Sequence, residues 1–137
     1  MTLQVHLTYP TKSTEACLDQ IMELIDQYPY LGWKRSRLEQ CYLIRVMRGD
    51  ELCTIIWLEN VPVPGKFVVE AHCVAALKWH RRWVTKGVIR ALSHIYCDVL
   101  DLDALIAQTP TAYHRRIWSG LGAEDHVVYA LLKKNGD

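Results

Sequence analysis

The feature that most constrains the fold is a β-branched segment followed at once by a basic turn and an amphipathic helix. Residues 67–75 (FVVEAHCVA) follow Pro64-Gly65 and predict a strand. From about Arg82 to Asp98 the apolar residues recur at helical spacing. The turn between them, residues 76–82 (ALKWHRR), is basic. Because the first amides of a helix lack internal partners and the helix dipole is positive there, this arrangement favours a phosphorylated ligand.

The rest of the chain predicts strands and helices around this unit. Ser13 is a predicted N-cap, and Pro29 is predicted to end that helix after Tyr28. Thr109 caps a predicted last helix. Residues 60–65 are predicted as a loop. Residues 30–40 are predicted as a loop or short helix, which is either a connector that Trp33 anchors to the core or a segment that gates access to a site. The other predicted strands are residues 3–8, a hairpin of 41–48 and 51–58 turning at Gly49-Asp50, and residues 104–107 and 126–132.

Size and charge restrict the classes of protein that fit. A chain of 137 residues is expected to form a single domain. The formal charge of +1 gives no general attraction to nucleic acid, so no nucleic-acid partner is expected. No apolar run reaches the roughly 20 residues that span a bilayer, and the N-terminus does not resemble a signal peptide, so no membrane partner is expected. Five scattered cysteines indicate reduced thiols and a cytoplasmic protein, and no metal site is expected.

Two segments resemble the GNAT acetyltransferases. Residues 81–92 (RRWVTKGVIRAL) resemble the pyrophosphate loop and following helix of that family, in the Arg-Arg-Trp-rich version common in phages and prophages. Residues 117–124 (IWSGLGAE) are similar to its helix ending. The resemblance covers nearly the whole chain. It implies a single GNAT-like α/β domain, residues 1–137, with a mixed, mostly antiparallel sheet flanked by helices on both faces.

The resemblance also implies a transferase that uses acetyl-CoA. In the family the cofactor lies where the fourth strand splays from its neighbour, and the splay is expected here at Val74. The family's direct amine attack on the thioester implies transfer of acetyl to a primary amine, of a small molecule or a protein. The implied cofactor-binding residues are Cys73, Val74 and Ala75 at the strand end, and Arg81, Arg82, Trp83, Val84, Thr85, Lys86 and Gly87 in the loop.

Candidate acid–base groups lie on the same strand and on the last predicted helix. Glu70 and His72 are two residues apart, so they share one face of the strand, and either is a candidate base. The family's tyrosine acid falls at Trp118, whose indole cannot donate a proton to a thiolate, so Tyr113 is the candidate acid. The loop also departs from the family's usual Gly-x-Gly/Ala pattern, and only one strand is predicted after the last helix, where the family usually has two. These departures keep an alternative open. In it, a catalytically silent phage protein uses the fold for virion assembly or protein binding, with phage structural proteins as partners in the host cytoplasm or virion.

Overall fold

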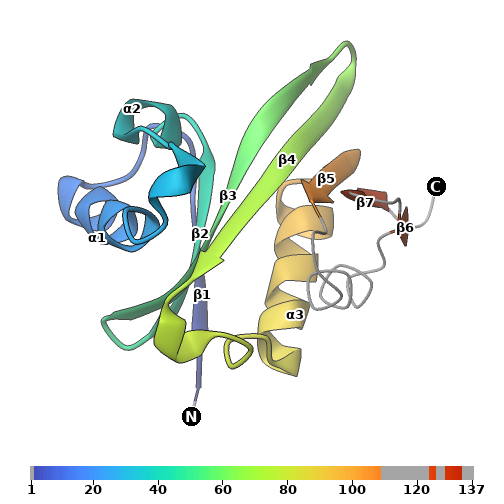
Figure 1. Ribbon diagram of the computed structural model, residues 1–137. Helices are drawn as coiled ribbons and strands as arrows, with labels where there is room; N and C mark the ends of the chain where they lie inside the picture. Colours follow the sequence, from blue (N-terminus) through green and yellow to red (C-terminus); the bar gives the residue numbers. More distant parts are fainter. Residues whose placement is uncertain (1, 109–123, 126–128, 134–137) are drawn as a thin grey trace. The chain divides into compact units, whose positions relative to one another are not determined.

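The structure, a computed structural model, describes residues 2–108, 124–125 and 129–133. The chain divides into two compact units. Figure 1 labels the helices and strands that they contain. The first comprises Met1–Leu58 and Cys73–Trp83, and the second comprises Glu59–His72 and Val84–Asp137. The prediction of a single domain stays a prediction, and each unit is described by itself.

The strands form one mixed sheet in the order β1-β2-β3-β4-β5-β7-β6. In the first unit, β1 pairs with β2 and β2 with β3, both antiparallel. In the second unit, β4 pairs with β5 in parallel, and β7 pairs antiparallel with both β5 and β6. The α/β class with a mixed, mostly antiparallel sheet is therefore confirmed. The strands are β1 (Gln4–Thr8), β2 (Tyr42–Arg48), β3 (Glu51–Val63), β4 (Lys66–Ala75), β5 (Ala104–Gln108), β6 (Glu124–Asp125) and β7 (Tyr129–Lys133).

Helix α1 (Glu15–Ile25) covers the core of the first unit. Its N-cap is Thr14, whose hydroxyl accepts from the Cys17 N–H at 3.1 Å, and not Ser13 as predicted. The helix also ends earlier than predicted, leaving Tyr28 outside it, because a residue before proline is pushed out of the helical region. Its buried face packs with β2 and β3 through Leu18, Ile21, Leu24, Ile25, Leu43, Ile55 and Trp57.

The connection from α1 to β2 is short and anchored by Trp33. It contains the 3₁₀ turn Pro29–Leu31 and α2 (Arg35–Leu38), so the predicted short helix is present. The Trp33 ring meets Trp57 edge-on, with centroids 5.4 Å apart, and the Arg37 guanidinium lies 3.8 Å from the Trp33 ring. Trp33 therefore attaches this connection to the core, as predicted.

The β2–β3 hairpin turns at Gly49, whose φ of 58° suits glycine. The next strand is longer than predicted. β3 continues through Pro62 to Val63, and only Pro64 and Gly65 form the turn into β4, so most of the predicted loop 60–65 is strand. Proline is tolerated where its missing N–H is not needed by a neighbouring strand.

Helix α3 (Lys86–His94) begins four residues later than predicted and continues as the π-helical turn Ile95–Val99. Arg81 lies in the left-handed region at φ 62°, which interrupts any helix through Arg82. Thr85 is extended, and its hydroxyl accepts from the Val88 N–H at 3.2 Å. The N-cap at Thr85 therefore sets the start of the helix.

The C-terminal strands differ from prediction in number. The predicted strand 126–132 corresponds to β7, which covers Tyr129–Lys133, and β6 pairs with it. Two strands are thus present where one was predicted, which agrees with the GNAT pattern. The predicted last helix, with Tyr113 and Trp118, lies outside the described residues.

Candidate functional site

The C-terminal end of β4 has an edge that continues beyond its ladder with β5. Cα pairs join Val68–Ala71 to Ala104–Ala107, whereas β4 runs on to Ala75. Val74 would stand opposite position 110, which is outside the described residues, so the splay predicted there stays a prediction. The second unit thus contains the paired part of β4, and the first unit contains its last three residues.

The backbone hydrogen bonds show which residues of β4 direct their N–H and C=O groups toward the β5 side. The Phe67 carbonyl accepts from the Asp103 N–H at 2.9 Å, and the Phe67 N–H donates to the Asp103 carboxylate at 2.6 Å. The Ala76 N–H instead donates to the Cys53 carbonyl of β3 at 2.9 Å. Because successive residues of a strand direct their backbone groups to opposite edges, the N–H and C=O of Cys73 and Ala75 point away from β3.

Two side chains of the first unit meet at the last residue of this edge. The Tyr28 hydroxyl donates to the Ala75 carbonyl at 2.8 Å, and it lies 3.1 Å from His80 Nε2. Tyr28 is half-buried and His80 is exposed. A titratable pair therefore stands at the end of β4, with one member open to water.

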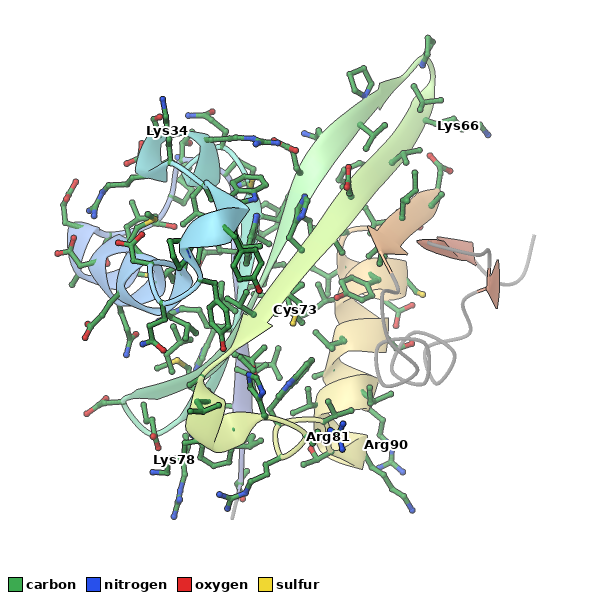
Figure 2. All side chains as sticks on the ribbon, viewed as in Figure 1. Lys34, Lys66, Cys73, Lys78, Arg81 and Arg90 are labelled. Atoms are coloured by element: carbon green, nitrogen blue, oxygen red, sulfur yellow. The ribbon has the colours of Figure 1, made fainter. Side chains whose placement is uncertain are left out.

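Burial holds the thiol and the phenol near this edge in their protonated forms. It raises the pKa of the Cys73 thiol to about 12. The pKa of Tyr28 is also raised above 10.0, first by burial and then by the neighbouring Tyr30 and Cys73. Both groups are therefore neutral proton donors at physiological pH. Figure 2 shows Cys73 on β4.

A basic cluster surrounds the buried Trp79 just after β4. The guanidinium groups of Arg82 and Arg48 lie 5.2 and 5.9 Å from the indole centroid, and the Lys78 ammonium lies 6.0 Å from it. Glu51 joins the cluster, since its carboxylate is 3.2 Å from the Lys78 ammonium. The pKa of Glu51 is lowered by the nearby Trp79 indole and by the bond from Lys78. Three cations and one anion lie around the Trp79 ring, so the cluster has a net positive charge and attracts anions.

The two predicted arginines differ from expectation in their backbone setting. The Arg82 N–H donates to the Trp79 carbonyl at 2.9 Å, and Arg81 is in the left-handed region. Both arginines were predicted at the start of the helix, but they precede α3, which begins at Lys86. Both side chains are exposed. Trp83 is buried, with 4% of its surface exposed, so its indole serves packing. Lys78 and Arg81 lie on the connection that follows β4 (Figure 2).

The first turn of α3, in the second unit, has space over its backbone. A Cβ placed on Gly87 would meet only Thr85 Oγ1 within 4 Å, at an ordinary contact distance of 3.9 Å. Packing therefore does not require glycine here. Val84 is half-buried, while Thr85 and Lys86 are exposed. These are the predicted loop residues that belong to this unit.

The two candidate bases also belong to the second unit. Glu70 and His72 are both half-buried and share one face of β4, as the strand period predicts. Glu70 stands opposite Ile106 in the ladder with β5. The geometry places them together, and their role as a base stays a prediction.

Two observations concern metals and membranes. Among the described residues there is no group of three or more His, Cys, Asp or Glu side chains that could hold a metal ion. In the same part of the chain, no helix has the length and apolar character to cross a bilayer.

Sequence reasoning missed Tyr28 and His80 as a pair. Tyr28 continues the apolar spacing of α1, and His80 reads as one more charge of the basic turn. Their contact joins positions 52 apart, which no local pattern reports. The one available signal was Pro29, which releases Tyr28 from the helix.

Neither a family model nor a curated protein matches the sequence. Solved structures match it by fold. A GNAT-family acetyltransferase from Streptococcus pneumoniae superposes with a TM-score of 0.65 at 6% identity, over 98% of this chain and 100% of its own. The Campylobacter jejuni N-acetyltransferase PseH in complex with acetyl coenzyme A gives 0.59 at 14% identity, over 96% and 100%. An aminoglycoside acetyltransferase in complex with coenzyme A and kanamycin gives 0.64 at 14% identity, over 95% of each chain.

The chain has the GNAT fold. The resemblance seen in the sequence is therefore confirmed at the level of the fold. The phage-type branch stays a prediction, since these structures do not bear on it.

Proposed function

We propose that this protein is an N-acetyltransferase that transfers the acetyl group of acetyl-CoA to a primary amine. The observation that carries the proposal is the match to GNAT structures over nearly the full length of both chains, two of them with acetyl-CoA or CoA bound. The end of β4 supports it locally. The strand continues past its ladder with β5 and directs the backbone of Cys73 and Ala75 away from β3.

The proposed cofactor site uses backbone groups for the pantetheine and cations for the phosphates. The amides and carbonyls of Cys73 and Ala75 would pair with the pantetheine as a further strand would, with Val74 between them. In the same unit, Arg82 and Lys78 over Trp79, together with exposed Arg81, offer charge-assisted bonds to phosphate oxygens. Trp83 would hold this segment in place through burial.

The second unit, taken by itself, holds further candidate groups for anion binding and proton transfer. The first turn of α3 carries N–H groups that an anion can approach over Gly87, with Thr85 and Lys86 exposed beside it. Glu70 or His72 would accept the proton that the acceptor ammonium must lose before it attacks. Each of these assignments is a proposal that rests on the GNAT fold.

Cofactor binding is the first test. A ligand present at 100 times its Kd adds about 2.7 kcal/mol of stability, which for a chain of this size raises the melting temperature by roughly 10 °C. We expect that shift with acetyl-CoA and a much smaller one with ATP, which has phosphates but no pantetheine. Equal shifts would indicate diffuse attraction of phosphates. No shift with either would favour the alternative of a silent GNAT-fold protein with a role in assembly or protein binding.

A further inference from the structure

The hydrogen bonds at Tyr28 fix the positions of two protons. A phenol has one hydrogen, and at 2.8 Å Tyr28 donates it to the Ala75 carbonyl. The phenol oxygen can then only accept from His80, 3.1 Å away, so His80 carries its proton on Nε2. The chain of donors runs from an exposed imidazole through a half-buried phenol to the edge of β4.

This series of hydrogen-bond donors ends where the proposed cofactor would lie. The Ala75 carbonyl points to the edge away from β3, so the Tyr28 hydroxyl is at that same edge. We infer that Tyr28 is the acid that protonates the departing thiolate of CoA, and that His80 positions Tyr28 and returns its proton. The inference rests on the proposed acetyl transfer, and it assigns an acid to a chain whose expected acid position holds Trp118.

The proton transfers balance as follows. The neutral amine attacks the thioester carbonyl carbon, the C–N bond forms, and the C–S bond breaks. The departing sulfur takes the Tyr28 proton, and the nitrogen releases its extra proton to water. The Tyr28 oxygen takes the Nε2 proton of a His80 imidazolium, and the exposed ring regains a proton from water. The products are the acetamide and the free CoA thiol.

The groups that surround Tyr28 are compatible with its role as a proton donor. Besides His80 and the Ala75 carbonyl, they are Tyr30, whose ring centroid is 6.2 Å away, and the Cys73 thiol. Burial, Tyr30 and the Cys73 thiol raise the pKa of Tyr28, so the phenol keeps its proton until a thiolate accepts it. The role therefore stands on the hydrogen-bond geometry, and these neighbours support it.

The surroundings also guide the choice of amine for the test. Tyr30 is 80% exposed and Leu77 is 78% exposed. Tyr30 touches Tyr28, and Leu77 lies in the 3₁₀ turn Leu77–Trp79 directly before His80. Large apolar side chains so open to water can contact an apolar part of an acceptor. Phenethylamine, a primary amine with an aromatic ring, is accordingly the probe.

The test measures release of free CoA from acetyl-CoA and phenethylamine over a range of pH. We expect Tyr28→Phe to lower kcat by about 100-fold or more with little change in KM for acetyl-CoA. His80→Gln keeps an N–H donor for Tyr28 but cannot titrate. We expect it to lower kcat about tenfold, because glutamine cannot return a proton to Tyr28, and to make kcat less dependent on pH. Tyr9→Phe, at an exposed tyrosine paired with Tyr42, is the matched control and should be unchanged.

The outcomes separate the two proposals. If the unmodified protein neither binds nor consumes acetyl-CoA, the proposed function is overturned and the acid role with it. If it consumes acetyl-CoA and Tyr28→Phe, folded by circular dichroism, keeps the full rate, only the acid role is overturned. If His80→Gln keeps the pH profile of the unmodified protein, His80 does not return the proton.

Discussion

The Tyr28 hydroxyl donates to the Ala75 carbonyl across 2.8 Å, joining residues 47 positions apart. Tyr28 follows α1, and Ala75 is the last residue of β4, so one bond ties the N-terminal helix to the strand end of the same unit. The contact has a structural consequence besides its proposed chemistry. It gives a hydrogen-bond donor to the Ala75 carbonyl, which points away from β3 at the end of β4.

Removing this hydroxyl should cost a measurable part of the stability. Tyr28→Phe keeps the ring and deletes the donor to Ala75, so we expect the free energy of unfolding to fall by about 1 kcal/mol. Urea titration followed by circular dichroism measures it. Tyr9→Phe, on an exposed ring, should change the stability by less than about 0.5 kcal/mol. Equal effects of the two substitutions would mean that the bond to Ala75 contributes nothing specific.

The thiol of Cys73 should make the fold sensitive to alkali. Its pKa is raised by burial from 9.0 to about 12, so between these values the unfolded chain ionises this thiol and the folded chain does not. Stability that is full below pH 9 is then lost as the pH rises toward 12, with a slope of about 1.4 kcal/mol per unit from this group.

A comparison of slopes isolates the contribution of Cys73. Cys73→Ala lacks the thiol, so its unfolding free energy should fall less steeply with pH above 9 than that of the unmodified protein. Urea titrations at pH 8, 9, 10 and 11 on both proteins provide the slopes. Parallel curves would show that the Cys73 sulfur reaches water in the folded protein.

The N-cap of α3 gives a prediction for the second unit. Thr85→Ala removes the acceptor for the Val88 N–H and should destabilise the protein by about 1 kcal/mol, whereas Thr85→Ser should cost little. Thermal unfolding of the three proteins measures both changes. Equal stability of the alanine and serine variants would show that the Thr85 hydroxyl does not act as a cap.

The elements that were predicted correctly carry their signal locally. The strand at residues 67–75 is defined by its β-branched run and by Pro64-Gly65, and the structure has β4 there. The β2–β3 hairpin follows from Gly49, which adopts the left-handed φ that its turn requires. The order of elements then indicates the fold class, because few topologies accommodate that order.

The errors arise where longer-range structure overrides a local pattern. The apolar period beginning at Arg82 is real, but the left-handed Arg81 and the extended Thr85 delay the helix to Lys86. Pro62 reads as a loop, yet it lies within β3. The candidate site follows the same rule. The β4 end could be identified from sequence, whereas the Tyr28–His80 pair could not, because it depends on how α1 and β4 pack.

The late start of α3 changes what charge substitutions can test. Arg90 is only the fifth residue of α3, about 6 Å of helix rise from Lys86. It is therefore a poor control for charge near the loop. Lys66 is better, because it begins β4 and lies nine residues before Ala75, about 30 Å along the strand.

Affinity for CoA should depend on the arginines that follow β4. Arg81→Gln with Arg82→Gln removes two exposed cations, one of them 5.2 Å from the Trp79 ring centroid, while leaving donors of similar length. Charge-assisted bonds to phosphate contribute about 1.5–3 kcal/mol each, so we expect CoA binding to weaken tenfold or more. Lys66→Gln should change it by less than twofold, because a charge that far from the phosphates is screened. Calorimetry at fixed salt compares the three proteins. Similar losses from the double variant and from Lys66→Gln would indicate diffuse attraction, and full affinity in the double variant would place the phosphates away from these arginines.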